Sequence, residues 1–255
     1  MRYLMFTFHK AGSMVQHRYL GWLAEITGLP HHSLNYREDE PARRRHGLNS
    51  RPTEADQTWW QDTARHLHGI VGPIRRPAAL PDDVSDRVVI AVRDPRDALT
   101  SLFYSRAISH GGVADDLRRA WLDMGIDRFV MEHLPDLKDR LVKYRAMLEM
   151  HLGWPLLRYE DMVLRFDQWF DKLLKGFGLE PDPVAVAAFV AKEMEQYRML
   201  VVDRQLRERP DLHIRSVAPG DHRKKLRHET VAAIEAALAD ELAFFGYASS
   251  GDVAR

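Results

Sequence analysis

The sequence predicts an α/β protein in which a single, mainly parallel β-sheet is flanked by helices. Two nearly unbroken apolar runs, Tyr3–Phe8 and Val88–Val92, have the composition of strands that are buried on both faces, as in parallel sheets. Each run stops at a short polar loop, and apolar residues at helical spacing follow. Strand, tight loop and helix in this order is the repeating unit of parallel α/β folds. With 255 residues the chain can form one sizeable core, so we expect one domain over 1–255.

The first loop is predicted to bind an anion. Lys10-Ala11-Gly12-Ser13 joins the first strand to a helix, whose end is marked by Gly28 and Pro30. This geometry directs backbone N–H groups and the positive end of a helix dipole at one spot. The loop does not fit the Walker A pattern G-x-x-x-x-G-K-[ST], in which glycine precedes the lysine. Taken alone, the four residues are also compatible with an ordinary strand-to-helix turn.

Composition excludes several classes of protein. Lys plus Arg and Asp plus Glu both number 37, which argues against a dedicated nucleic-acid or membrane-surface protein. The chain has no cysteine, so disulfides, zinc–thiolate sites and a thiol nucleophile are excluded. No apolar run approaches the roughly 18 residues of a spanning helix, and the first residues have a strand pattern instead of that of a signal peptide. We therefore expect a cytoplasmic protein without a membrane span.

The polar and charged stretch after the first helix is predicted to be a long surface loop, with a flexible loop or lid around 36–63. Its Arg43–Arg45 run has two interpretations. A solvated charge run is the simpler one, and steering of an acidic acceptor is the other. Beyond it, Leu67–Ile74 is a second candidate strand. Gly69 and Gly72 interrupt this strand, where they either allow close approach of a ligand or only bulge it.

The third strand is also followed directly by a helix that begins at the edge of the sheet. It ends in Arg93-Asp94-Pro95-Arg96-Asp97, where Asp94 suits a helix N-cap and Pro95 the first turn. In P-loop kinases and ATPases the corresponding strand ends in an acid that holds Mg²⁺, whereas this one ends in arginine. The histidines, including the His31-His32 pair, lack the spacing of a ligand set. We therefore expect no metal.

The rest of the chain is expected to be mostly helical. Proline, glycine and the apolar period predict helices over Ala114–Met124, Arg128–Met150, Phe166–Phe177 and Val184–Met194, and a last helix from Val231 to Phe245. A strand and turn over Pro155–Met162 interrupt the series.

Three segments together resemble the sulfotransferases that use 3′-phosphoadenylyl sulfate (PAPS). Lys10-Ala11-Gly12-Ser13 is similar to that family's 5′-phosphosulfate loop, roughly K-[SA]-G-[ST]. Arg93–Ser101 matches the 3′-phosphate motif R-[DN]-P-x-D-x-x-x-S at every fixed position. Arg215–Lys225 resembles R-K-G-x-x-G-D-W-K in part, with Ser216, Val217 and His222 in place of Lys, Gly and Trp. The competing explanation of the second match is an Arg93–Asp97 pair with Ser101 as a plain helix serine.

The resemblance implies the P-loop NTPase-like sulfotransferase fold, PAPS as co-substrate and 3′,5′-adenosine bisphosphate (PAP) as product. It also implies a set of binding residues. In the first loop these are Lys10, Ala11, Gly12, Ser13 and Met14, and elsewhere they are Arg93 and Ser101 for the 3′-phosphate, Tyr159 beside the adenine, and Arg215, Ser216 and Val217 in the third segment.

The activity implied is transfer of a sulfuryl group to a hydroxyl or amine of a small-molecule, glycan or lipid acceptor. Lys10 would stabilise the leaving phosphate and Thr100 would hold Lys10 back until it is needed. His68, in the region before the second motif, is the candidate general base. Two alternatives stay open: an ATP-dependent P-loop kinase, and a nucleotide-binding relative without transfer activity.

Overall fold

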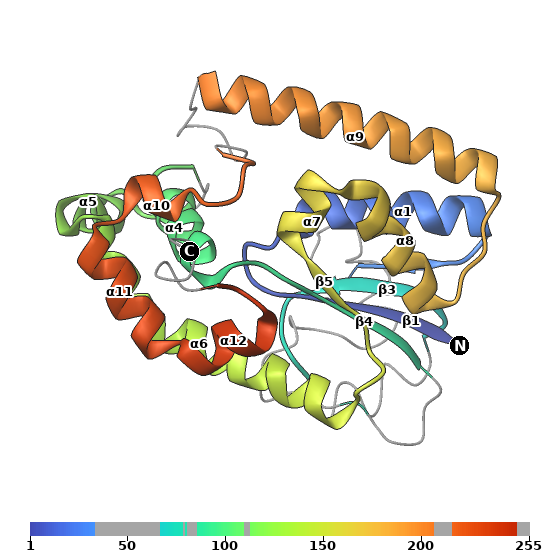
Figure 1. Cartoon of the computed structure of the whole chain (residues 1–255), viewed down its shortest axis with the longest axis horizontal. Coiled ribbons are helices and arrows are strands. Elements are labelled where there is room, and N and C mark those ends of the chain that lie inside the picture. Colours follow the sequence, from blue (N-terminus) through green and yellow to red (C-terminus); the bar gives the residue numbers. More distant parts are fainter. Residues whose placement is uncertain (34–66, 79, 81–85, 110–112, 207–215, 249–255) are drawn as a thin grey trace.

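The computed structural model describes residues 1–33, 67–78, 80, 86–109, 113–206 and 216–248. The predicted lid around 36–63, with Arg43–Arg45, and the candidate site residue Arg215 lie outside these residues. Five parallel strands form one sheet in the order β2-β3-β1-β4-β5 (Figure 1). The strands are β1 (Arg2–Thr7), β2 (His31–His32), β3 (Gly69–Ile74), β4 (Asp86–Val92) and β5 (Leu156–Arg158). The α/β class and the parallel sheet are therefore confirmed.

Helices cover both faces of the sheet (Figure 1). One face carries α1 (Ser13–Thr27), α7 (Tyr159–Leu164), α8 (Phe166–Phe177) and, outside them, α9 (Pro183–Leu206). The other face carries α4 (Pro95–Tyr104), α6 (Ile126–Met150), α11 (His228–Ala237) and α12 (Ala239–Phe245). The π-helical turn η3 (Ser105–Ser109), α5 (Asp115–Met124) and α10 (His222–Lys225) lie beyond the carboxyl ends of the strands.

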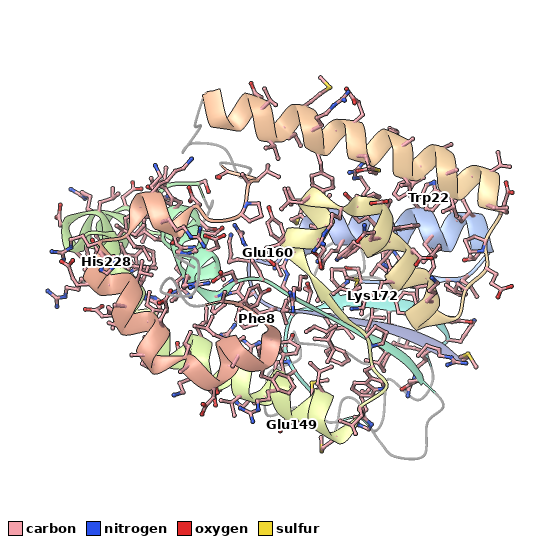
Figure 2. All side chains as sticks on the ribbon, viewed as in Figure 1. Phe8, Trp22, Glu149, Glu160, Lys172 and His228 are labelled. Carbon is pink, nitrogen blue, oxygen red and sulfur yellow. The ribbon has the colours of Figure 1, made fainter. Side chains whose placement is uncertain are left out.

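Alternation along β1 divides the apolar residues into two cores. Leu4, Phe6 and Phe8 belong to the core under α6, whereas Met5 belongs to the core under α1 and α8. Figure 2 shows Phe8 on the α6 side of the sheet and Trp22 between α1 and α9. The first is in edge-to-face contact with Tyr144 of α6, and the second stacks on Phe189 of α9. Both layers are thus fixed to the strand that carries the first loop.

The two glycines of β3 allow neighbouring backbone to come close. A Cβ on Gly69 would lie 2.4 Å from the carbonyl oxygen of Pro30, and one on Gly72 would lie 2.7 Å from that of Met5. The β1–β3 register shifts between Leu4 and Phe6, beside Gly72. Of the two interpretations of these glycines, the structure supports the bulge, because strand backbone fills the space that a ligand would need.

Several elements differ from the sequence-based expectation. Helix α9 continues past Met194 to Leu206, because the intervening residues include good helix formers and no glycine or proline. The expected last helix is divided at Leu238 into α11 and α12. The two-residue strand β2 and the single turn α10 are too short to give a periodic signal.

No helix within the described ranges has both the length and the apolar character needed to cross a bilayer.

Candidate active site

The loop after β1 has an unusual backbone conformation. Lys10 has φ +65° and Gly12 has φ +87°, and the Ala11 N–H between them donates to the Phe8 carbonyl over 3.1 Å. A left-handed conformation costs a residue with a side chain about 1 kcal/mol or more. Such residues gather at ligand sites, where the surrounding structure holds them in place. The positive φ of Lys10 therefore marks this loop as a candidate binding loop.

A buried glutamine fixes the loop against the sheet. The Nε2 of Gln16, in the first turns of α1, donates to the carbonyl of Ala11 over 2.8 Å. Its Oε1 accepts a hydrogen bond from the Thr7 hydroxyl, and the Thr7 carbonyl accepts one from Tyr144 over 3.1 Å. All three side chains are buried. The loop is therefore held rigidly from both the α1 and the α6 side.

The N-terminus of α1 is open toward the loop. Its N-cap is Gly12, no side chain caps it, and its first turn contains no acidic residue. Within the described part of the chain, the N–H groups of Ser13 and Met14 have no acceptor. Unpaired N–H groups and the helix dipole at this position favour an anion.

Gly12 is required here for space as well as for conformation. A Cβ on Gly12 would lie 2.8 Å from the Met162 Cε and 3.3 Å from the ring of Tyr159. Both neighbours belong to α7, which starts directly after β5. The first loop is therefore in close contact with the segment that carries the predicted adenine contact.

Arg93 connects β4 to this loop. Its Nη1 donates to the carbonyl of Lys10 over 3.0 Å, and its guanidinium lies over the Tyr159 ring, 4.3 Å from the centroid. The side chain is almost fully buried, and its Nε has no hydrogen-bond partner among the described residues. A buried guanidinium N–H without an acceptor costs free energy, so this donor is available to an anion bound at the loop.

The residues after Arg93 form a separate network. Asp94 caps α4 by accepting from the Arg96 N–H over 2.9 Å and forms an ion pair with the Arg96 side chain. The Asp94 N–H donates to Glu160, which also accepts from the Tyr247 hydroxyl. Burial raises the pKa of Glu160. Figure 2 shows Glu160 at the carboxyl edge of the sheet. This network fixes the start of α4 and leaves Arg93 to the loop.

Asp97 holds the third segment in place. One carboxylate oxygen accepts from the Gly220 N–H over 2.7 Å, and the other accepts from the N–H and Nδ1 of His222 over 2.9 and 2.6 Å. Burial alone would raise the pKa of Asp97, but the hydrogen bond from His222 and the charge of Arg93 lower it to about 2. These oxygens are bonded to the 216–222 loop, and Arg93 acts on Asp97 through its charge without a direct ion pair between the two.

The other predicted site residues are placed as follows. Tyr159 is buried between Arg93 and Gly12, and its hydroxyl donates to the Val217 carbonyl over 3.0 Å. Val217 is buried, whereas Ser216 and Ser101 are half-buried. Thr100 is fully buried and its hydroxyl donates to the Arg96 carbonyl in its own helix, so its hydrogen bond does not go to Lys10.

His68 does not join this group. It is exposed and directly precedes β3, and its carbonyl oxygen lies 3.1 Å from the Nε2 of His32. Lys10 follows the carboxyl end of β1, which runs parallel to β3. A strand of this length spans about 20 Å, so His68 and Lys10 lie at opposite edges of the sheet. The structure therefore does not bring the predicted base to the loop.

The histidine that the structure does place there is His9. It is half-buried at the carboxyl end of β1. Burial lowers its pKa to about 3, together with the charges of Lys10, Arg140, Arg75 and Arg106. Its imidazole is therefore neutral at pH 7. Its position next to Lys10 is visible in the sequence, but the cationic surroundings come from elements far away along the chain.

No group of three or more potential metal ligands occurs within the residues that the structure describes.

Comparison with solved structures identifies the fold of this chain. No family model and no curated protein matches the sequence. Among the solved structures that match, three cover 94% of this chain. Mouse sulfotransferase SULT7A1 complexed with PAP is 13% identical, with 83% of its chain covered and a TM-score of 0.55. Retinol dehydratase in complex with androsterone and inactive cofactor PAP is 13% identical (80% covered, TM-score 0.53), and the same enzyme with retinol and PAP is 14% identical (81% covered, TM-score 0.50).

These neighbours define the class of fold, which is that of the PAPS-dependent sulfotransferases. The expected P-loop-like α/β fold is therefore confirmed for this chain.

Proposed function

We propose that the protein is a sulfotransferase that moves a sulfuryl group from PAPS to a hydroxyl or amine of an acceptor. The observation that carries this proposal is Arg93, a buried guanidinium at the end of β4 that is bonded to the anion loop after β1 and has an unpaired Nε. The two candidate anion-binding elements are thereby joined into one site. The fold that it shares with PAP-bound structures supports the same ligand.

The described residues fit PAPS. The N–H groups of Gly12, Ser13 and Met14, at an uncapped helix N-terminus, suit the 5′-phosphate. Arg93 suits the 3′-phosphate, with the half-buried hydroxyl of Ser101 about two turns along α4. We assign Tyr159 a positioning role, because its ring supports the Arg93 guanidinium. The 216–222 loop, bonded to Tyr159 through the Val217 carbonyl and to Asp97 through Gly220 and His222, would cover the bound nucleotide.

In the reaction PAPS supplies the sulfuryl group, whose bond to the 5′-phosphate oxygen breaks as a bond from sulfur to the acceptor oxygen or nitrogen forms. The electron pair leaves with the bisphosphate, and the acceptor proton passes to a base. Lys10 donates to the leaving oxygen from the loop that holds the 5′-phosphate. Of the described histidines, His9 is the one beside Lys10, and we propose it as the proton acceptor in place of His68.

The comparisons bear on the chemical class of the acceptor. Retinol dehydratase was crystallised in complex with retinol and with androsterone, which supports a small organic acceptor for this chain. We propose a small-molecule, glycan or lipid acceptor with a hydroxyl or amine. No observation favours the kinase alternative, because β4 ends in Arg93 where a Mg²⁺-binding acid is needed.

The test is calorimetric titration of the purified protein with PAP and, in parallel, with ATP and Mg²⁺. We expect micromolar PAP binding and weak ATP binding, followed by transfer of label from ³⁵S-PAPS. Arg93→Ala should weaken PAP binding about 100-fold, whereas Arg87→Ala, on the same strand at its exposed amino end, should leave it unchanged. Tight ATP–Mg²⁺ binding without PAP binding would establish the kinase. PAP binding without transfer to any acceptor would establish the non-catalytic relative.

A further inference from the structure

His222 has a buried ring nitrogen without a hydrogen-bond partner. The residue is 1% exposed, and its Nδ1 lies 2.6 Å from a carboxylate oxygen of Asp97. The other ring nitrogen, Nε2, is buried and has no hydrogen-bond partner within the described part of the chain. A buried polar atom in this state costs free energy, which a ligand can recover by bonding to it. His222 is therefore a candidate ligand contact.

Asp97 determines which nitrogen of His222 carries a proton. The hydrogen bond from His222 and the charge of Arg93, acting against burial, lower the pKa of Asp97 to about 2. At pH 7 this carboxylate is ionised and can only accept, so Nδ1 donates to it, as the backbone N–H of His222 does over 2.9 Å. These two hydrogen bonds fix the orientation of the ring. In a neutral imidazole Nε2 is then a bare acceptor, and in a protonated one it is a donor.

The contact with Asp97 brings His222 to the proposed 3′-phosphate residues. Helices α4 and α10 pack against each other here (Figure 1). Ser101 follows Asp97 by one helical turn, so the two side chains share one face of α4. Arg93 lies close enough to Asp97 for its charge to act on the carboxylate. The imidazole therefore contacts the face of α4 that carries the Ser101 hydroxyl, near the Arg93 guanidinium.

The charges around His222 come from several elements. Asp97 belongs to α4, and Arg93 ends β4. Asp221 precedes His222, is buried as well and acts on Arg93. Glu235 of α11 has its own ion pair with α4. The other charged side chains of α10 and of the start of α11 are exposed or half-buried: Arg223, Lys224, Lys225, Arg227, His228 and Glu229. When protonated, His222 forms an ion pair with Asp97, so its charge is not buried alone.

We propose that His222 binds the 3′-phosphate of the nucleotide, with a protonated Nε2 that donates to the same phosphate as Arg93 and Ser101. An ionised phosphate oxygen accepts hydrogen bonds, so this contact requires the proton on Nε2. His222 belongs to the 216–222 loop that would cover the nucleotide, which lets the ligand supply the missing acceptor. This inference rests on the proposed sulfotransferase function and adds a residue that distinguishes PAPS from nucleotides without a 3′-phosphate.

The sequence of the third segment agrees with this role. The pattern that the segment resembles begins with two basic residues, whereas here Arg215 is followed by Ser216. His222 stands where the pattern has a tryptophan, which carries no charge. A positive charge missing at the start of the segment can therefore be supplied by His222 at its other end.

The experiment compares calorimetric titrations with PAP and with AMP, which lacks the 3′-phosphate. His222→Leu should weaken PAP binding about 30-fold and leave AMP affinity within about threefold, because one charge-assisted contact is lost and the 5′-phosphate loop is unchanged. His222→Gln should lose less, since its amide N–H can take the place of the Nε2 donor. His228→Leu removes an exposed histidine at the start of α11, and as the matched control it should change neither affinity.

A second measurement needs no substitution. Long-range ¹H–¹⁵N spectra of histidine side chains distinguish a protonated ring nitrogen from a bare one. In the PAP complex of the wild-type protein, both ring nitrogens of His222 should carry a proton.

Each result has a separate meaning. Equal losses of PAP and AMP affinity in His222→Leu would make His222 a packing residue of the loop, and this inference would be wrong. A bare Nε2 in the PAP complex would overturn it as well, because the nitrogen would then be an acceptor. If the wild-type protein does not bind PAP, the proposed function itself fails. Thermal unfolding shows whether the His222 variants are folded during the titration, and the wild-type spectra decide the question if they are not.

Discussion

The Nη1 of Arg93 donates to the backbone carbonyl of Lys10 over 3.0 Å, and this hydrogen bond joins the end of β4 to the loop after β1. Two motifs that lie 83 residues apart in the sequence are therefore parts of one site. Tyr159 supports the same guanidinium from the end of β5. The carboxyl ends of three adjacent parallel strands, β1, β4 and β5, thus meet at one place, which is where ligand sites lie in this class of fold.

The first prediction concerns Arg93. Arg93→Ala should weaken PAP binding about 100-fold, because a charge-assisted contact contributes about 1.5–3 kcal/mol and the site offers Arg93 to the 3′-phosphate. Arg93→Lys should restore little, since an ammonium cannot both bond to Lys10 and present a second N–H in the same plane. Titration with PAP and with AMP measures this. AMP lacks the 3′-phosphate, so equal losses for both ligands would contradict the assignment.

The second prediction distinguishes the effect of a steric clash at Gly12 from the effect of its backbone conformation. Gly12 and Gly28 both have positive φ, at +87° and +66°, but a Cβ on Gly28 meets nothing within 4 Å. Replacing either by Ala should lower the free energy of unfolding by about 1 kcal/mol through backbone strain. Gly12→Ala should in addition remove PAP binding, because its Cβ would displace Tyr159 and Met162. Chemical denaturation and calorimetry of the two variants, side by side, measure both effects.

Equal PAP affinity of Gly12→Ala and Gly28→Ala would show that the close contact between the loop and α7 is not needed for binding.

Much of this site could be predicted from the sequence because each anion loop is local. Lys10 to Ser13 and Arg93 to Ser101 each follow a recognisable apolar strand, and the parallel sheet then requires their carboxyl ends to meet. The general base is the part of the site that the sequence predicts least well. His68 lies near the second motif in the sequence, but it precedes a strand, whereas the two loops each follow one. The cationic surroundings of His9 could not be predicted, since they depend on how α6 and η3 pack.

The third prediction follows from the lowered pKa of Asp97. Its pKa is about 2 in the folded protein against an ordinary 3.8, so the unfolded chain binds this proton more readily. The carboxylate therefore contributes stability, about 2 kcal/mol, that is present above pH 4 and is lost as the pH falls toward 2. Asp97→Asn should lose this contribution at pH 7. The stability difference between the two proteins, measured by urea unfolding, should shrink between pH 5 and pH 3.

A stability difference that stays constant over that range would mean that Asp97 does not hold the 216–222 loop as a carboxylate. PAP affinity should follow the same trend, because the loop lies over Tyr159 and Arg93.

The fourth prediction assigns Lys10 to the transition state. Lys10→Met should lower kcat at least 100-fold and leave PAP affinity within about threefold, because backbone N–H groups hold the 5′-phosphate and the ammonium acts on the charge that develops during transfer. Methionine keeps the length of the side chain without its charge. Single-turnover transfer from ³⁵S-PAPS, with calorimetry of PAP on the same protein, measures the two quantities. A loss confined to PAP affinity would make Lys10 a binding residue only.

The last prediction tests His9 through the pH dependence of the reaction. Burial and the charges of Lys10, Arg140, Arg75 and Arg106 lower the pKa of His9 to about 3, so in the free protein its imidazole accepts a proton only below about pH 4. Because kcat/KM reports groups of the free enzyme, its acid limb should lie near that pH, with no inflection at the 6.5 of an ordinary histidine. His9→Asn should lower kcat with PAP affinity intact and remove this acid limb. An acid limb near pH 6.5 in kcat/KM that persists in His9→Asn would assign the proton transfer to a different histidine.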